Sequence, residues 1–321
     1  MEHLSFLGLV QDDLKRVEAV LREQPLDQHE AINSAVDYLI GSGGKRLRPA
    51  LVLLSSALCN ADKERAIYAA AGVEMLHTAT LVHDDLIDGA LMRRGRGTLN
   101  ARWTPGATVL TGDYLFARAA SLVAQADSTR LTRRFAETLM IICNGEIAQM
   151  FDTPARTVTR QQYERRIYAK TASLIALSTQ AGPILAQADE AINQALLAYG
   201  EQVGLAFQIV DDVLDFVADE ETLGKPIGSD LRQGLVTLPT LLFLEAEPDH
   251  PLLRQVLADA APDDALRQAV QLIAASPAVQ QALAIAGDYC HQAIQALRDF
   301  PASPYKEALV ELAEFTACRR F

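Results

Sequence analysis

The segment AAAGVEMLHTATLVHDDLI, residues 69–87, joins a long run of apolar side chains to a pair of aspartates. Its apolar residues lie on all sides of a helical wheel, which is typical of a central helix covered by others. A second such segment, Ala195 to Val217, ends in VDDVLDFV. Alternating apolar and polar runs bounded by turns, the pattern of strands, are missing from the sequence. We therefore expect an all-α fold, a single large helical bundle around a central cavity.

Length and charge limit the possible classes of protein. The chain has 321 residues and no stretch with the composition of a linker, so residues 1–321 are interpreted as one domain. Its 29 basic and 41 acidic residues give a net charge of −12, which argues against nucleic acid as a partner. The four cysteines lack CxxC spacing, and no apolar run reaches membrane-spanning length. The expectation is a cytoplasmic protein without an integral membrane segment.

The same spacing of acids, Asp-Asp-x-x-Asp, occurs twice. The first cluster is Asp84, Asp85 and Asp88, and the second is Asp211, Asp212 and Asp215. On a helix the three acids of each cluster point to one side, where their charges repel. Carboxylates with open coordination positions suit Mg²⁺ shared with a substrate phosphate. An isolated cluster could be a solvated helix end, but both clusters end the most apolar helices of the chain, which favours two metal-binding clusters.

A glycine-rich basic turn, GGKRLRP at residues 43–49, is the third motif. Backbone N–H groups and the side chains of Lys45, Arg46 and Arg48 could bind a phosphate-bearing ligand. The segment is not a Walker A loop, because Leu39 stands where that loop has its first glycine. Taken alone, it could also be an ordinary basic turn.

The order of these motifs carries a resemblance to a known family. From about residue 30 to residue 245 the sequence contains GGKRLRP, LHTATLVHDDLIDGALMRRG, GDYLFARA, YAKTASL, GLAFQIVDDVLDF and LGKPIGSDL. In this it resembles the trans-polyprenyl diphosphate synthases, and among them bacterial medium- and long-chain enzymes such as octaprenyl diphosphate synthases, which make quinone side chains. The resemblance implies the isoprenoid synthase fold, a homodimer, and condensation of an allylic diphosphate with isopentenyl diphosphate.

The resemblance also implies roles for individual residues. Both aspartate clusters would bind the Mg²⁺ ions, three per active site, that hold the allylic diphosphate. Arg93, Lys170 and Lys225 would add positive charge to that diphosphate. Isopentenyl diphosphate would be held by Lys45, Arg48, His77 and Arg94. Thr171 and Gln208 would direct dipoles at the developing carbocation. His83 is interpreted as a satisfied, partly buried histidine rather than as a base.

Two positions bear on activity and product length. The family usually has Gly-Lys-x-Thr after the second cluster, whereas this chain has Gly234, Leu235, Val236 and Thr237. The missing lysine normally helps to bind the allylic diphosphate. In the family a bulky aromatic residue five positions before the first cluster stops elongation early, and here that position is Ala79. The resemblance therefore predicts a long product, on the order of eight isoprene units.

Two other functions remain open from the sequence. A terpene cyclase also binds Mg²⁺ through DDxxD, but it does not need GGKRLRP, and its usual second metal motif is not seen here. A non-catalytic or weakly active subunit of a heteromeric prenyl synthase is the other alternative. Such subunits commonly lose an aspartate motif, whereas both are whole in this chain, and only Leu235 favours this hypothesis.

Overall fold

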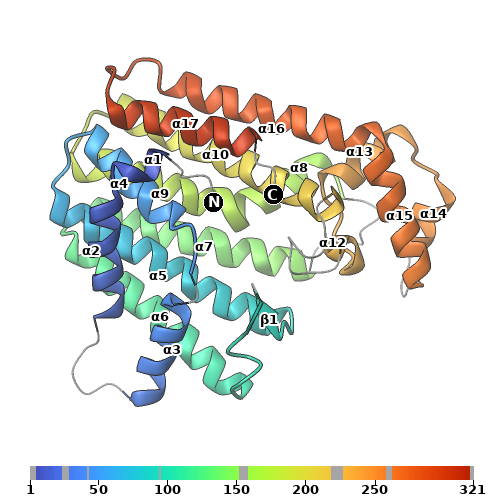
Figure 1. Ribbon diagram of the computed structural model, residues 1–321, viewed down its shortest axis with the longest axis horizontal. Coiled ribbons are helices and arrows are strands. Elements are labelled where there is room, and N and C mark those ends of the chain that lie inside the picture. The colour runs from blue at the N-terminus through green and yellow to red at the C-terminus, as the bar shows by residue number, and fades with distance from the viewer. Residues whose placement is uncertain are drawn as a thin grey trace. The chain divides into compact units, whose positions relative to one another are not determined.

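The computed structural model describes residues 5–23, 29–41, 43–93, 95–151, 158–217, 227–257 and 262–318. Its elements are helices apart from one short hairpin, so the predicted all-α fold is confirmed (Figure 1). The chain divides into two compact units made of segments distant in sequence. Unit 1 contains Met1–Leu139, Leu174–Gly200 and Asp299–Glu311, and unit 2 contains Met140–Ser173, Glu201–Arg298 and Leu312–Phe321. The single domain and the central cavity stay predictions.

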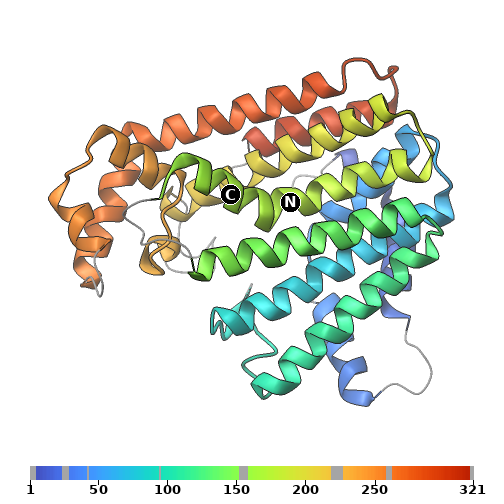
Figure 2. The ribbon, with the colours of Figure 1, turned by 180° about the vertical axis from the view of Figure 1, so that it is seen from behind.

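Unit 1 is built around α5 (Lys63–Ile87), the predicted apolar helix. Its other elements are α1 (Ser5–Gly8), α2 (Gln11–Arg22), α3 (Glu30–Ile40), α4 (Leu47–Leu58), β1 (Met92–Arg93), β2 (Arg96–Gly97), α6 (Pro105–Gln125), and most of α9 (Ser173–Leu185). Helices α2, α4 and α6 pack against α5, and α6 lies beside it in both views (Figures 1 and 2). Covered in this way, α5 is buried on most of its circumference, as its composition predicts.

Local sequence explains where α5 begins and why α6 can approach it. The side chain of Asp62 caps the helix by accepting a hydrogen bond from the backbone N–H of Arg65, at 2.9 Å. A Cβ atom at Gly72 would lie only 2.4 Å from Cγ2 of Val123 on α6, so only glycine allows this close packing. Gly89, with φ of 62°, follows the last turn, and the chain then turns into the hairpin.

Unit 2 holds a second hydrophobic core. Its elements are α8 (Arg160–Ile167), η2 (Tyr168–Ala172), α12 (Ser229–Arg232), α13 (Leu238–Ala246), α14 (Pro251–Val256), α15 (Asp263–Ala275) and α16 (Pro277–Ala296). Besides α9, whose first residue Ser173 belongs to unit 2, three helices of the described chain contribute residues to both units: α7 (Thr129–Phe151), α10 (Glu190–Val217) and α17 (Pro304–Cys318). The C-terminal part of α10 is lined with buried residues such as Ile209 and Val213, which pack in this core. The second predicted apolar helix is thus also confirmed.

Turns separate the long helices of unit 1. The glycine-rich turn separates α3 from α4, and the hairpin with its following turns separates α5 from α6. Within the described ranges no single helix is long and apolar enough to cross a membrane. Helices α15 and α16 reach the required length and composition only when taken together, and they are bent by 59° relative to each other.

Candidate active site

The first aspartate cluster lies at the C-terminal end of α5, in unit 1. Asp84 is half-buried, Asp85 is buried, and Asp88 is an exposed residue that caps the helix. Carboxylates are unfavourable at a helix C-terminus, where the helix dipole is negative. Burial raises the pKa of Asp85, although the neighbouring Arg93 opposes this shift. The ionised forms of these carboxyl groups are therefore unfavourable by themselves, and a bound cation would stabilise them.

The β1–β2 hairpin places Arg93 on this cluster. The two strands pair in antiparallel register, with Arg93 opposite Arg96. Nε of Arg93 donates to Oδ1 of Asp85 at 2.7 Å. The hairpin is itself fixed to the end of α3, because the hydroxyl of Tyr38 donates to the carbonyl oxygen of Gly97 at 2.6 Å. The predicted contact of Arg93 with a diphosphate stays a prediction, and Arg94 lies outside the described residues.

The three basic residues of the glycine-rich turn, Lys45, Arg46 and Arg48, differ in their surroundings. Arg46 has a left-handed backbone, with φ of 48°, and its guanidinium forms ion pairs with Glu74 at 2.8 Å and Glu18 at 3.1 Å. This cation therefore fixes the turn to α5 and α2 and is not available for a ligand. Lys45 is exposed in the turn and Arg48 is half-buried in the first turn of α4. The resemblance assigns both of them, together with His77 and Arg94, to isopentenyl diphosphate, and this assignment stays a prediction.

Three further predicted positions lie on α5. His77 is half-buried and Ala79 is fully buried, with 0% of its surface exposed. His83 is half-buried beside α6: its Nε2 lies 3.2 Å from the carbonyl oxygen of Val109, and its ring packs against Phe116 at 5.2 Å between centroids. The interpretation of His83 as a satisfied histidine is confirmed. Gly112 makes room for this ring, because a Cβ there would meet it at 2.1 Å.

The second cluster lies at the end of α10, in unit 2, and its three acids have different surroundings. Asp211 is half-buried, whereas Asp212 and Asp215 are buried. The carboxylate of Asp215 accepts from the Ser229 hydroxyl at 2.8 Å and from the Asp230 N–H at 3.1 Å, so it anchors the start of α12. Asp211 is therefore the acid of this cluster most open to a ligand.

Asp212 is the centre of a buried chain of hydrogen bonds. The hydroxyl of Tyr163 donates to Oδ2 of Asp212 at 2.7 Å, and Nε2 of Gln208 donates to Oδ1 at 2.8 Å. The hydroxyl of Thr171 donates to Oε1 of Gln208 at 2.6 Å. Because a carboxylate only accepts hydrogen bonds, Asp212 fixes the orientation of the Gln208 amide. Burial raises the pKa of Asp212 to about 7, and both hydrogen bonds oppose that rise.

Thr171 and Lys170 lie in a π-helical turn, η2. Such turns are frequent at functional sites. Two glycines allow it to pack closely: a Cβ at Gly145 would lie 2.4 Å from Cβ of Ala169, and one at Gly204 would lie 2.5 Å from Cα of Ala172. Nζ of Lys170 forms an ion pair with Glu146 at 3.0 Å while its side chain stays 38% exposed. Lys225 lies outside the described residues.

Two residues of α8 that the sequence analysis did not single out belong to this region. Tyr163 is the fully buried donor to Asp212, and Arg166 lies with its guanidinium 5.6 Å from the Tyr163 ring centroid. Both precede Lys170 at helical spacings of seven and four residues. That spacing was a signal that could have placed them on the same side of the helix.

The donor set of the two clusters fits magnesium. Mg²⁺ prefers carboxylate oxygens and usually binds through one or two of them, together with waters and substrate phosphates. Across the part of the chain that the structure describes, no three or more acidic, histidine or cysteine side chains form a closed metal cage. Asp84 and Asp211 are half-buried acids that offer this partial type of site. Either residue could hold such an ion jointly with a diphosphate.

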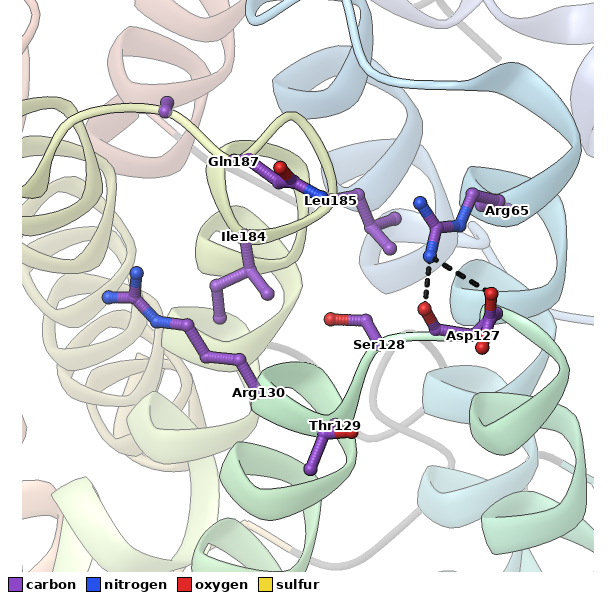
Figure 3. A pocket seen from close by; sticks show the side chains of 9 residues that line it. Arg65, Asp127, Ser128, Thr129, Arg130, Ile184, Leu185 and Gln187 are labelled. Carbon is purple, nitrogen blue, oxygen red and sulfur yellow. Dashed lines mark hydrogen bonds and ion pairs between the residues drawn. The ribbon is translucent and has the colours of Figure 1, made fainter.

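A hollow in unit 1 lies apart from these residues. It has a volume of about 330 Å³ and is lined by Arg65 at the start of α5 and by residues in and beside the turns before α7 and α10, among them Asp127 and Gln187 (Figure 3). Nε of Arg65 donates to the carbonyl oxygen of Ala126 at 2.7 Å, and Arg130 pairs with Glu190 at 2.7 Å. None of the predicted site residues lines this hollow, so it is not the candidate active site.

Comparisons with known proteins agree with the motifs. A family model described as polyprenyl synthetase matches residues 29–273. The heptaprenyl diphosphate synthase component 2 of Geobacillus stearothermophilus is 38% identical, over 100% of both chains. The octaprenyl diphosphate synthase of Escherichia coli is 33% identical, over 97% of both chains. A crystal structure of a polyprenyl synthase from Caulobacter crescentus, complexed with calcium and isoprenyl diphosphate, has a TM-score of 0.92 at 36% identity, covering 98% of this chain and 97% of that one. The chain belongs to the polyprenyl synthetase family.

Proposed function

We propose that this chain is a Mg²⁺-dependent trans-polyprenyl diphosphate synthase. It condenses an allylic diphosphate, farnesyl diphosphate as the primer, with isopentenyl diphosphate to give a medium- or long-chain product that serves as a quinone side chain. The observation that carries the proposal is the pair of aspartate clusters at the ends of two largely buried helices, α5 and α10. The Caulobacter relative binds calcium and isoprenyl diphosphate, which supports a divalent metal with a diphosphate in the same kind of site.

The reaction breaks one bond and forms another. The C–O bond of the allylic diphosphate breaks, and the alkene of isopentenyl diphosphate forms a C–C bond with the allylic carbon. A C–H bond of the resulting cation then breaks, its electron pair forms the new double bond, and its proton passes to the pyrophosphate. Pyrophosphate is released. When bound, Mg²⁺ ions, three per site, stabilise the charge that grows on the leaving diphosphate. No protein nucleophile takes part.

The residues of the chain bind and orient the two substrates in this proposal. The metal ions are bound by the six acids of the two clusters: Asp84, Asp85, Asp88, Asp211, Asp212 and Asp215. Arg93, Lys170 and Lys225 bind the allylic diphosphate, and Lys45, Arg48, His77 and Arg94 bind isopentenyl diphosphate. The hydrogen bond from Thr171 to Gln208, at 2.6 Å, supports the role of both as oriented dipoles near the carbocation. Fixed dipoles of this kind need no reorganisation during the reaction.

A homodimer in the cytoplasm is the proposed state of the enzyme. Apolar side chains are exposed on α6, where Leu110 is 69% exposed, and separately on α7, where Met140 is 63% exposed. Single exposed apolar side chains are normal on a protein surface, so the proposed homodimer rests on the resemblance to the family.

A second function is favoured by one comparison. The Geobacillus relative is a component of a heptaprenyl diphosphate synthase, and Leu235 stands where the family usually has lysine. The chain could accordingly act as one subunit of a two-component enzyme.

One assay separates the two functions. The purified chain is incubated with Mg²⁺, farnesyl diphosphate and radiolabelled isopentenyl diphosphate, and the products are separated by length. A synthase active by itself gives labelled polyprenyl diphosphate that disappears in EDTA. A partner subunit gives no labelled product alone, and that result would overturn the proposal. A labelled hydrocarbon would instead indicate a cyclase.

A further inference from the structure

The loop that lacks the family lysine is contacted by an arginine from another element. Nη2 of Arg166, on α8, donates to the carbonyl oxygen of Val236 at 2.6 Å. Val236 directly follows Leu235, and the backbone N–H of Leu235 is fixed by the carbonyl oxygen of Asp230 at 2.9 Å. The guanidinium therefore lies beside the backbone of the position at which the resemblance to the family implies a lysine.

The same guanidinium lies close to the second aspartate cluster. It is 5.6 Å from the ring centroid of Tyr163, and the hydroxyl of that ring is hydrogen-bonded to Asp212. A cation at this place would stabilise an anionic ligand bound next to the cluster.

One donor of Arg166 is used in a hydrogen bond within the part of the chain that the structure describes. A guanidinium has five N–H donors, and the bond to Val236 uses one of them. Within the described ranges, no carboxylate lies within ion-pair distance of Arg166, and its side chain is half-buried. Lys170, one helical turn further on, is by contrast already paired with Glu146. Arginine binds phosphate oxygens through two parallel N–H donors, which makes it suited to this ligand.

We infer that Arg166 binds the allylic diphosphate and supplies the positive charge that Leu235 does not. The inference rests on the proposed function, since it assigns one more residue to the diphosphate of that reaction. Arg166 is thus a substrate-binding residue contributed by α8 rather than by the loop after the second cluster. It also explains how the site can tolerate an apolar residue at position 235.

A set of four variants tests this. Arg166→Gln removes the charge, and Arg165→Gln removes an exposed charge from the neighbouring position of α8 as the matched control. The double variant Arg166→Gln/Leu235→Lys returns a positive charge at position 235. The single variant Leu235→Lys is the fourth member of this double-mutant cycle. The readouts are the KM for farnesyl diphosphate, the KM for isopentenyl diphosphate, the melting temperature, and calorimetric binding of inorganic pyrophosphate in the presence of Mg²⁺.

Arg166→Gln should raise the KM for farnesyl diphosphate and weaken pyrophosphate binding by about ten- to a hundredfold, the range for a charge-assisted hydrogen bond. The KM for isopentenyl diphosphate and the control Arg165→Gln should stay at wild-type values. In the double variant, lysine at position 235 should restore most of the lost affinity because it returns a positive charge. The recovery should be incomplete, because lysine does not replace the hydrogen bond from Arg166 to Val236. A lower melting temperature with unchanged pyrophosphate binding, or a loss that Lys at 235 does not restore, would show that Arg166 only holds the loop.

The pyrophosphate titration also separates this inference from the proposed function. If the wild-type chain has no turnover alone, the proposal of an independently active synthase fails, but the binding data still decide the role of Arg166. If turnover is present and pyrophosphate binds equally well to wild type and Arg166→Gln, the inference fails while the proposed function stands.

Discussion

Replacing Tyr163 by Phe should destabilise the protein in a pH-dependent way. The Tyr163 side chain is fully buried, and its hydroxyl donates to the buried carboxylate of Asp212 at 2.7 Å. Above pH 7 that carboxylate is ionised, and losing a hydrogen bond to a buried charge costs about 1.5–3 kcal/mol. Below pH 7, Asp212 is protonated because burial has raised its pKa to about 7, and the lost bond is then worth only about 0.5–1.5 kcal/mol.

The sign follows from the pKa of Asp212. Its folded-state pKa lies above the value of 3.8 expected for the unfolded chain, so the native protein binds the extra proton and loses stability as pH rises towards 7. Removing the Tyr163 hydroxyl removes a group that opposes this shift, and the native pKa rises further. The difference in unfolding free energy between wild type and Tyr163→Phe should therefore grow between pH 5.5 and pH 8.5, by about 1 kcal/mol or more.

The assay is urea unfolding in EDTA at those two pH values, followed by circular dichroism. Tyr199→Phe is a matched control, because Tyr199 is also fully buried and donates at 2.7 Å, but to the neutral carbonyl oxygen of Leu309. Its loss should be about 0.5–1.5 kcal/mol at both pH values. Equal, pH-independent losses in the two variants would refute the reasoning, because they would show that Asp212 does not change its charge in this range.

Three further predictions concern catalysis. Asp84→Ala or Asp211→Ala should remove most turnover while the helical circular dichroism signal is kept, because acids that repel each other contribute little to the metal-free fold; full activity in either variant would contradict the metal-binding role. Ala79→Tyr should shorten the product to about three or four isoprene units, as chromatography of the dephosphorylated products would show, with an unchanged distribution placing the limit elsewhere. Leu235→Lys should lower the KM for farnesyl diphosphate at an unchanged melting temperature, whereas a lower melting temperature without kinetic gain would make Leu235 a packing residue.

The helices that carry the two clusters were predictable from sequence for a physical reason. An apolar pattern on all sides of a helix needs cover on all sides, and α5 and the end of α10 are covered in this way. The hairpin after α5 was not predicted. Its strands, Met92–Arg93 and Arg96–Gly97, have two residues each, too few for an alternating pattern to be visible.

The inner structure of the site was less accessible from sequence. Spacing on a helix makes the acids of the second cluster look equivalent, yet the tertiary contacts separate them. Asp215 is buried because Ser229 and Asp230, from a later segment, fold over it. Asp212 is tied to Tyr163, 49 positions earlier in the chain. Such contacts depend on how distant segments pack, and no local pattern around residues 211–215 encodes them.

We propose that both aspartate clusters bind one diphosphate through metal ions. The most direct measurement is a calorimetric titration of inorganic pyrophosphate into the purified wild-type chain, Asp84→Ala and Asp211→Ala, each with Mg²⁺ and with EDTA. We expect binding that requires Mg²⁺ and that weakens by about tenfold or more in either variant, since each loses a carboxylate ligand of a shared ion. Equal affinity in EDTA, or wild-type affinity in either variant, would contradict it.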